Sequence, residues 1–475
     1  MAVPSAYAVA GTTVSAPAPI VDPALLAKYA FSGPRYTSYP TADRFSDRFG
    51  PADALRQLSE RSGDAGRGPV SVYVHLPFCD TVCYYCACNK VVTRDRTRAA
   101  EYLSYLEREI ATQRGALGRD ETVAQLHWGG GTPTFLSADE MARLYGLLGR
   151  YFALVPDGEY SIEVDPRRVV AGTMEQLGAL GFNRVSLGVQ DFDPVVQKKV
   201  NRVQSIEETA RVMLGARTAG FRSVSFDLIY GLPAQSAQSI ARTLDTVLEL
   251  RPDRIALYNY AHLPAVFMPQ RRIDAAELPS PEEKIRILTL AIRALSAAGY
   301  VYIGMDHFAL PGDDLARAQA SGELHRNFQG YSTYARCDLL AFGVSAISSV
   351  GDSYAQNHRT LEEYYASLAR GELPVFRGHR LDDDDRLRRE VIQQLSCRFR
   401  VSFDDLGQRF GVDCASHFAQ ERARLAELED DGLVERVPDG LAVTERGRLL
   451  VRVICMAFDR HLRGAPSAAR YSKVV

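Results

Sequence analysis

Residues 71–90 read SVYVHLPFCDTVCYYCACNK, an alternating apolar run that ends in four cysteines. Cys79, Cys83 and Cys86 are separated by three and by two residues, and Cys88 follows closely. Three thiolates on one tight loop can hold three irons of a [4Fe–4S] cluster and leave the fourth iron open to another ligand. The alternative is a zinc site, because four cysteines including Cys88 also suit a tetrahedral ion. Zinc ribbons usually combine cysteine pairs from two separate hairpins, so this single run favours the iron–sulfur cluster.

Strand-like runs continue on the C-terminal side of the cysteines and alternate with segments of helical spacing. After the first run at 71–78, they lie at 124–130, 160–166, 184–190, 223–233 and 254–260. Between two of them, Ser205 and Glu208 have the spacing of a helix capping box. Such alternation is typical of right-handed βαβ units and a parallel sheet. Six units predict an α/β fold with a partial (β/α)6 TIM-like barrel.

Residues capable of chemistry follow these predicted strands at the points where the strands end. They are Cys79, the glycine run 129–131, Glu163, Gln190, Asp227 and Ala261-His262. Polar residues often end strands simply because a loop begins there. Six strand ends in a row favour one shared site, because the carboxyl ends of parallel barrel strands converge.

The pattern changes after residue 262. A helix is expected over 282–298, a strand over 300–310 and a polar loop over 325–334; helical pieces follow at 381–397, 402–410 and 413–431, and then a hairpin with its turn at 438–440. Three helices and a hairpin outline a smaller, mostly helical unit that resembles a winged helix. A DNA-binding role competes with a role as lid or packing domain, and the acidic third helix favours the latter. We expect a leader at 1–22, a segment at 23–69 that folds over the active site, a catalytic domain at 70–370 and a C-terminal domain at 371–475.

The composition excludes some classes of partner. A net charge of −2 gives no global electrostatic footprint for nucleic acid or anionic membrane. No run approaches the roughly 20 apolar residues of a membrane span, and the first 22 residues lack the pattern of a secretory signal. The eight cysteines do not form a secreted disulfide framework. We therefore expect a cytoplasmic protein with no nucleic-acid or membrane partner.

The motifs together resemble one family. The cysteine spacing, with an aromatic residue before the third cysteine, resembles the radical S-adenosylmethionine (radical SAM) superfamily. Within it, the chain is similar to the oxygen-independent coproporphyrinogen III oxidases, also called coproporphyrinogen dehydrogenases. The resemblance includes SGPRYTSYPTA (32–42), HWGGGTPT (127–134), SIEVDPR (161–167), SLGVQDF (186–192), NRVQ (201–204), DLIYGLP (227–233), YNYAHLP (258–264), HRNFQGYSTY (325–334), GVSAISSVGDSYAQN (343–357) and ICMAFD (454–459).

The resemblance implies a reaction and its cofactors. A [4Fe–4S] cluster and two S-adenosylmethionine molecules would generate 5′-deoxyadenosyl radicals, which abstract hydrogen from the ring A and B propionates of coproporphyrinogen III. Oxidative decarboxylation of these propionates to vinyl groups would give protoporphyrinogen IX in haem biosynthesis. The implied partners are this substrate, an electron donor for the cluster and an unidentified terminal electron acceptor, and we expect a monomer.

The resemblance also implies residue roles. Metal ligands would be Cys79, Cys83 and Cys86, and residues near the two S-adenosylmethionine molecules would be Tyr73, Tyr85, Gly130, Gly131, Thr132, Glu163, Gln190, Arg202, Asp227, Ala261 and Ile347. Catalytic candidates are Tyr73, His75, Glu163, Phe328 and Gln329. Simpler interpretations remain open: His75 as a satisfied core histidine, Phe328 and Gln329 as loop packing, and Glu163 or Asp227 in a core ion pair with Arg202 or Arg184. Arg35 is a candidate clamp for a substrate propionate.

Two other functions are compatible with the same scaffold. One is a haem-carrying chaperone, and the other is a haem-modifying radical SAM paralogue. Both kinds of relative generally lack the fourth cysteine, here Cys88, and the leader motif at 32–42, and this chain has both. Departures from the family pattern are small, with Ala87 in place of an expected glycine and Tyr85 where phenylalanine is common.

Overall fold

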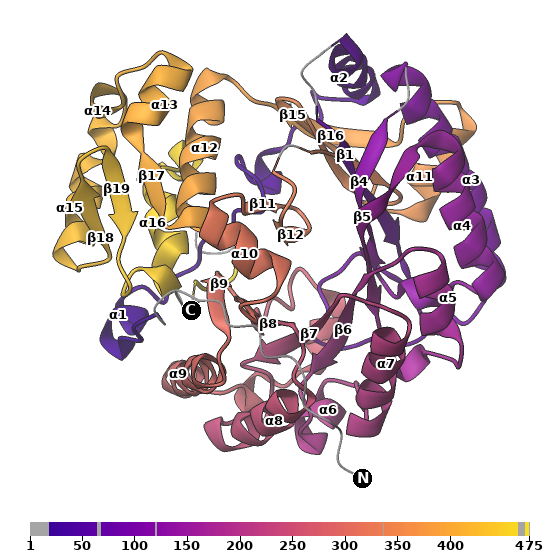
Figure 1. Ribbon diagram of the computed structural model, residues 1–475, viewed down its shortest axis with the longest axis horizontal. Helices are drawn as coiled ribbons and strands as arrows, with labels where there is room; N and C mark the ends of the chain where they lie inside the picture. Colours follow the sequence, from indigo (N-terminus) through magenta and orange to yellow (C-terminus); the bar gives the residue numbers. More distant parts are fainter. Residues whose placement is uncertain (1–18, 64–67, 119–120, 336, 464–470, 475) are drawn as a thin grey trace.

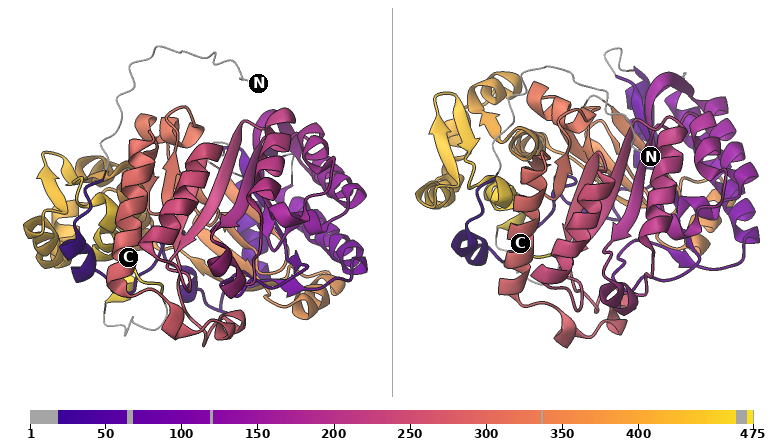
Figure 2. Two further views of the ribbon diagram at one scale, coloured as in Figure 1. Left: turned by 90° about the horizontal axis from the view of Figure 1, so that it is seen from below. Right: turned by 60° about the horizontal axis from the view of Figure 1, so that its bottom comes forward.

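The computed structural model describes residues 19–63, 68–118, 121–335, 337–463 and 471–474. Of the leader expected at 1–22, residues 1–18 lie outside this part of the chain. The largest sheet in the described residues has twelve strands in the order β16-β15-β14-β13-β1-β4-β5-β6-β7-β8-β10-β9. Figure 1 shows this sheet as an arc with helices along its outer side. Figure 2 shows from two other sides that the C-terminal unit, in yellow, lies at one end of the molecule.

Six consecutive parallel strands form the centre of the sheet, which confirms the predicted partial (β/α)6 barrel. They are β1 (Val70–Leu76), β4 (Thr122–Gly130), β5 (Ala153–Val164), β6 (Arg184–Gln190), β7 (Ser223–Tyr230) and β8 (Arg254–Asn259). The helices between and after them include α3 (Thr97–Leu117), α4 (Ala138–Tyr151), α5 (Thr173–Ala179), α6 (Pro194–Lys199), α7 (Ile206–Thr218), α8 (Ala237–Leu250) and α9 (Pro281–Ala297). The expected capping box of Ser205 and Glu208 begins α7.

Residue alternation gives the sheet two different faces. On β7, Val224, Phe226 and Leu228 are fully buried and share a core with Ile240 and Leu244 of α8. The alternate residues of the strand, which include Asp227, remain partly accessible. Successive side chains of a strand point to opposite faces, so the apolar set covers the helix side and the polar set faces the concave side.

Shorter strands extend the sheet beyond the six units. β13 (Asp338–Phe342) pairs parallel with β1, and β14 (Ile347–Val350), β15 (Ser353–Asn357) and β16 (Val375–Arg380) continue antiparallel. β16 therefore belongs to this sheet, although the C-terminal domain was expected to begin at residue 371. At the other edge, the segment expected as one strand over 300–310 is a hairpin of β9 (Val301–Gly304) and β10 (His307–Ala309).

The segment 325–334, expected as a polar loop, is also a hairpin. β11 (His325–Asn327) pairs with β12 (Gly330–Ser332), and Phe328 and Gln329 form the two-residue turn between them. Gly330 has a φ of 111°, a value that side-chain-bearing residues rarely adopt. The expectation of a loop was wrong because the paired runs are only three residues long, too short for a pattern of alternation.

The C-terminal unit contains helices and a small sheet, as its winged-helix outline predicts. Its helices are α12 (Asp383–Arg398), α13 (Phe403–Phe410), α14 (Cys414–His417), α15 (Arg422–Asp430) and α16 (Val451–Ala457). The hairpin of β18 (Val434–Val437) and β19 (Gly440–Val443) has its turn as predicted, and β17 (Arg400–Ser402) adds a third strand that the sequence did not indicate. The single helix expected over 413–431 is interrupted between α14 and α15 by a short 3-10 turn at Ala419–Glu421. Phe418 and Glu421 are buried at this interruption.

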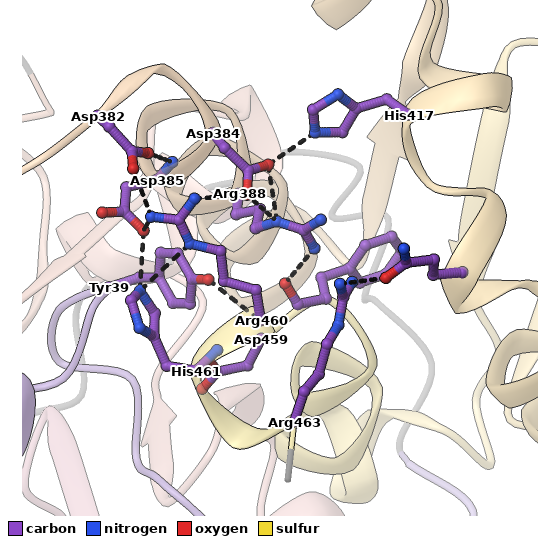
Figure 3. A network of polar contacts seen from close by, with 12 residues as sticks. Tyr39, Asp382, Asp384, Asp385, Arg388, His417, Asp459, Arg460, His461 and Arg463 are labelled. Atoms are coloured by element: carbon purple, nitrogen blue, oxygen red, sulfur yellow. Dashed lines mark hydrogen bonds and ion pairs between the residues drawn. The ribbon is translucent and has the colours of Figure 1, made fainter.

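A polar network ties this unit to the barrel and to the N-terminal segment (Figure 3). Asp385 at the start of α12 accepts hydrogen bonds from His379 of β16 at 3.0 Å and from His461 at 2.9 Å. Arg460 forms ion pairs with the same carboxylate at 2.8 Å, and its backbone N–H donates to the Tyr39 hydroxyl at 3.2 Å. The N-terminal segment, which includes α1 (Pro23–Lys28) and α2 (Pro51–Gly63), thus contacts the C-terminal unit through Tyr39. Within the described residues, no helix has the length and apolar character of a membrane span.

Candidate active site

The cysteine loop follows β1 and is closed by two short strands. β2 (Phe78–Cys79) pairs with β3 (Val91–Val92), which brings the two ends of the loop together. Thr132 Oγ1 donates to Cys79 Sγ at 3.6 Å, and Arg202 Nη1 donates to Cys83 Sγ at 3.6 Å. Donors aimed at sulfur favour the thiolate form, which is the form that binds metal.

The pKa values of the last two cysteines of the loop are shifted in opposite directions. The Cys88 thiol donates to the Cys86 sulfur and so lowers the pKa of Cys86, and the nearby Lys90 ammonium acts in the same direction. The pKa of Cys88 is correspondingly raised. Burial raises the pKa of Cys79 to about 11. The hydrogen bond from the Cys88 thiol therefore stabilises the thiolate form of Cys86.

The donor set of the loop fits a [4Fe–4S] cluster. Cys79, Cys83 and Cys86 are all partly accessible, and arginine and hydroxyl donors from outside the loop reach the sulfurs of Cys79 and Cys83. Hydrogen bonds to sulfur are a usual feature of protein-bound iron–sulfur clusters. In the part of the chain that the structure describes, no three Cys, His, Asp or Glu side chains lie together as the ligands of one single metal ion.

The glycine run at the end of β4 lies against the cysteine loop. A Cβ atom on Gly130 would lie 2.5 Å from the His75 ring, and one on Gly131 would lie 2.6 Å from the Pro77 backbone. The Gly131 N–H donates to the Leu76 carbonyl at 2.8 Å. The glycines thus permit a close approach between β4 and the chain leaving β1. The expected approach of a cofactor to Gly130, Gly131 and Thr132 stays a prediction.

Tyr73 and His75 form a fixed hydrogen-bonded chain on β1. His75 Nε2 lies 2.9 Å from the Asn89 carbonyl, which can only accept, so Nε2 carries the proton. His75 Nδ1 is then an acceptor, and the Tyr73 hydroxyl donates to it at 3.0 Å. Burial lowers the pKa of His75, which keeps the ring neutral. His75 is thus a buried histidine with both nitrogens satisfied, and it orients Tyr73.

Glu163 of β5 is bound by groups from β4. Gly130 N–H donates to Glu163 Oε2 at 2.9 Å, and His127 Nε2 lies 3.4 Å from Oε1. Burial alone would raise the pKa of Glu163, but the hydrogen bond and charge of His127, with the Gly130 amide, lower it below its ordinary value. The His127 ring also stacks on Tyr73, with centroids 5.7 Å apart. Glu163 is therefore held as a carboxylate beside the Tyr73 chain.

The pKa of Asp227 on β7 is shifted in the opposite direction from that of Glu163. Burial, and then the charge of Glu163, raise the pKa of Asp227 to about 7, and Ser186 donates to it at 3.0 Å. The two carboxyl groups thus have pKa values that are pushed apart, an arrangement typical of functional sites.

The alternative of a core ion pair for these two carboxyl groups is wrong. Arg202 forms its ion pair with Asp165 at 3.3 Å, and Arg184 forms one with Glu159 at 2.8 Å. Neither of these two arginines therefore pairs with Glu163 or Asp227.

Gln190, Arg202 and Tyr85 lie near the cysteine loop. Gln190 has a φ of 68° and follows a bulge in β6. A Cβ on Gly188 would lie 2.8 Å from Arg202 Nη2 and 3.0 Å from Gln190 Nε2, so both side chains converge on this glycine. The pKa of Tyr85 is raised by burial, and its backbone carbonyl accepts from Gln270 at 3.0 Å.

Three of the four remaining candidates, Ile347, Phe328 and Gln329, form a second group. Ile347 opens β14 and packs with Phe328 against a cluster that contains Phe45 and Tyr354. The Phe328 ring meets Tyr354 edge to face, with centroids 5.7 Å apart. The amide nitrogen of Gln329 is buried without a hydrogen-bond partner. Ala261 lies in the partly accessible turn after β8.

The sequence interpretation missed one residue of the group around Tyr73, His75 and Glu163, namely His127. His127 contacts Tyr73, Glu163 and also Ser161, whose Oγ is 2.6 Å from His127 Nδ1. Its position at the start of the HWGGG motif was the available signal, but only the pairing of β1, β4 and β5 reveals that these side chains share one face.

Comparisons with known proteins identify the class first. Residues 73–247 match the radical SAM superfamily, and residues 381–450 match the HemN C-terminal domain. Proteins of the radical SAM superfamily use a [4Fe–4S] cluster and S-adenosylmethionine, and these are the cofactors of this chain.

The particular family follows from similarity over nearly the whole length. The oxygen-independent coproporphyrinogen III oxidase of Pseudomonas aeruginosa is 52% identical over 456 residues, which cover 96% of this chain and 98% of that protein. The Escherichia coli (strain K12) protein of the same name is 48% identical over 454 residues, with 96% and 98% covered. The solved structure of coproporphyrinogen III oxidase (HemN) from Escherichia coli, a radical SAM enzyme, has a TM-score of 0.88 and 46% identity, covering 94% of this chain and 100% of that one. The chain belongs to the family of oxygen-independent coproporphyrinogen III oxidases.

Proposed function

We propose that this chain oxidatively decarboxylates the ring A and B propionates of coproporphyrinogen III, without oxygen, to give protoporphyrinogen IX. Each propionate loses one hydrogen atom from its β-carbon, one electron and CO2, and a vinyl group remains. The observation that carries the proposal is the similarity at 52% identity over 96% of the chain to a protein of this name, together with the intact cysteine motif. The terminal acceptor of the electrons is a separate molecule.

Cys79, Cys83 and Cys86 are the residues that we assign to the cluster. The cluster and S-adenosylmethionine, when bound, supply a radical strong enough to take hydrogen from an unactivated carbon. The chain contributes the donors to sulfur, because Thr132, Arg167 and Arg202 all face the cysteine loop. We expect two S-adenosylmethionine molecules, one for each propionate.

The carboxyl groups on the concave face suit the binding of these molecules. A Glu163 carboxylate can accept from an ammonium or a ribose hydroxyl, and Asp227 can accept from or donate to a hydroxyl because its pKa lies at about 7. The Tyr73 hydroxyl keeps its proton on the bond to His75 Nδ1, so its lone pairs are presented to the interior as an acceptor. Phe328 and Gln329 are assigned to the substrate side of the site.

The reaction is tested by product analysis. Anaerobically reconstituted protein given coproporphyrinogen III, S-adenosylmethionine and a reductant should release two CO2 per porphyrinogen, and a substrate deuterated at the propionate β-carbons should transfer label to 5′-deoxyadenosine. The Cys79→Ser variant is the control that lacks the cluster. Tight haem binding without decarboxylation would instead favour the chaperone function.

We expect the chain to act in the cytoplasm as a monomer, with an external electron donor and without a nucleic-acid or membrane partner. Size-exclusion chromatography with light scattering of the reconstituted protein tests the oligomeric state.

A further inference from the structure

Three arginines from distant parts of the chain meet beside β8 and β10. Arg35 comes from the N-terminal segment, Arg326 from β11 and Arg452 from α16. Arg35 forms an ion pair with Asp306. Within the described residues, neither Arg326 nor Arg452 has a carboxylate at ion-pair distance, so positive charge exceeds negative charge in this cluster.

Arg326 is the least satisfied of the three. Its side chain is almost fully buried, at 4% relative exposure, and Nε and Nη1 have no hydrogen-bond partner. Nη2 reaches only the Arg35 carbonyl, at 3.5 Å, and the guanidinium lies over the Tyr331 ring at 4.8 Å. Arg326 also lines a cavity of about 230 Å³. A buried cation ordinarily has an anionic partner, so a partner is missing from the protein itself.

The groups around Arg326 add to the excess of positive charge in this cluster. Arg452 donates to backbone carbonyls, including that of Pro34 at 3.1 Å, and burial together with the charge of Arg35 lowers the pKa of Arg452 to about 9. His307 on β10 has a buried Nδ1 without a partner, and burial and then Arg326 hold the pKa of His307 well below its usual range. A neutral His307 therefore leaves the arginines as the cations of the cluster.

This cluster adjoins the active site on the concave face. Asp227 of β7 pairs with Ala256 of β8, which in turn pairs with His307 of β10. Neighbouring strands are about 4.8 Å apart, so the backbones of Asp227 and His307 are about 10 Å apart. Tyr258, two residues beyond Ala256, has Arg35 over its ring at 5.3 Å. A ligand lying along this face can contact both the carboxyl groups of the site and the arginines.

We propose that Arg326, assisted by Arg35, binds a propionate carboxylate of the tetrapyrrole substrate. The inference rests on the proposed function, which supplies a substrate with four carboxylates. The planar guanidinium offers pairs of parallel N–H donors to a carboxylate; Arg326 Nε and Nη1 have no partner, and Nη2, which belongs to both pairs, makes only the 3.5 Å contact with the Arg35 carbonyl. S-adenosylmethionine also carries a carboxylate. The molecule that binds the cluster would lie at the cysteine loop after β1, six places along the sheet from β10, and the S-adenosylmethionine titration below distinguishes the second molecule from the substrate.

The test measures ligand binding directly. Reconstituted holoprotein is titrated with coproporphyrin III, the fluorescent oxidised form that retains all four propionates, and fluorescence quenching gives Kd. Arg326→Met should weaken Kd about 10- to 100-fold, since a charge-assisted bidentate contact is lost. Arg242→Met is the matched control, because Arg242 is an exposed arginine that already pairs with Asp193 at 2.8 Å, and it should leave Kd within about twofold.

Two further readouts separate binding from a structural role. The melting temperature of ligand-free Arg326→Met should equal or exceed that of the wild type, because the substitution removes an unpaired buried charge. The Kd for S-adenosylmethionine, measured by calorimetry, should not change. An unchanged Kd for coproporphyrin III would refute the inference, and a loss confined to S-adenosylmethionine would assign the arginine to that carboxylate instead.

A second variant covers the case in which Arg326→Met does not fold. Arg326→Lys keeps the charge and loses the planar pair of donors, so it should weaken coproporphyrin III binding several-fold, and unchanged binding would again refute the inference. Failure of the proposed function gives a different result: wild-type protein that binds coproporphyrin III with the predicted dependence on Arg326 but releases no CO2.

Discussion

Glu109 of α3 is a fully buried carboxyl group whose replacement should change how stability depends on pH. Four donors converge on it: Tyr364 O–H at 2.6 Å, Gly343 N–H at 2.8 Å, Asn357 at 2.7 Å and Gln113 at 3.2 Å. They anchor the turn between β13 and β14, directly before Ile347. Burial nevertheless raises the pKa of Glu109 from 4.5 to about 7. The folded protein therefore holds a proton at this group that the unfolded chain releases at lower pH.

The sign and size of the effect follow from this difference. Because the folded pKa is raised, the contribution to stability is complete below about pH 4.5 and is lost as the pH rises through about 7. Between pH 5.5 and pH 8 the loss amounts to about 2 kcal/mol. Glu109→Gln does not titrate, so the free energy of unfolding of the variant minus that of the wild type should rise by about 2 kcal/mol over the same interval.

Hydrogen bonding determines the absolute free energy of unfolding of the Glu109→Gln variant. With its NH2 group toward Tyr364, whose hydroxyl can turn to accept, Gln leaves the Gly343 N–H unpaired at a cost of about 1–3 kcal/mol. Urea unfolding of the purified holoprotein and the variant at pH 5.5 and pH 8 measures both quantities. A difference in unfolding free energy that stays constant between the two pH values, or that falls at pH 8, would refute a raised pKa for Glu109.

Three further predictions concern the site and its supports. Cys88→Ser should retain the iron and the visible absorbance that Cys79→Ser loses, since three thiolates already hold a cubane, and iron content with the absorption spectrum decides this; loss of iron equal to that of Cys79→Ser would make Cys88 a ligand. Tyr73→Phe should reduce decarboxylation at least tenfold while iron content stays unchanged, because the hydroxyl held by His75 is lost from the interior; full activity would exclude a role for that hydroxyl. Asp385→Asn should destabilise the protein by about 3 kcal/mol at pH 7, with a smaller effect below pH 4, because the lowered pKa of Asp385 gives a stability that disappears as the pH falls; thermal melts at the two pH values measure it, and equal losses at both would contradict the assignment.

Much of the fold was predictable because apolar and polar residues alternate along the strands, and the apolar set is the one that the structure buries. Val224, Phe226 and Leu228 are buried in the core that they share with residues of α8, and Asp227 between them faces the other side, as the period of two requires. The short hairpin at 325–332 and the break before α15 were not predictable, because each depends on tertiary contacts of a few residues and not on a repeating pattern.

The site was predictable as a set of strand ends but not as a set of contacts. The sequence offered Glu163 and Arg202 as possible ion-pair partners, yet Arg202 lies against Asp165 and Cys83, and Glu163 lies against His127. Which cation meets which carboxylate depends on strand register and bulges, such as the one before Gln190. The surplus charge at Arg326 is likewise visible only after segments far apart in the sequence have met.

The placement of the C-terminal unit argues for a role in completing the barrel. The central sheet has its two edges at β9 and at β16, and an uncovered edge exposes unpaired backbone groups. Residues of the N-terminal segment reach both sides, since Ser46 bridges Gly378 of β16 and Arg35 pairs with Asp306 beside β10. Helix α12 packs against β9 and β11, and its first residues bind His379 of β16. The unit thus joins the two edges of the sheet, which favours the expected packing role over DNA binding. Duplex binding tighter than micromolar at physiological salt, measured by fluorescence anisotropy on the full chain, would refute this argument.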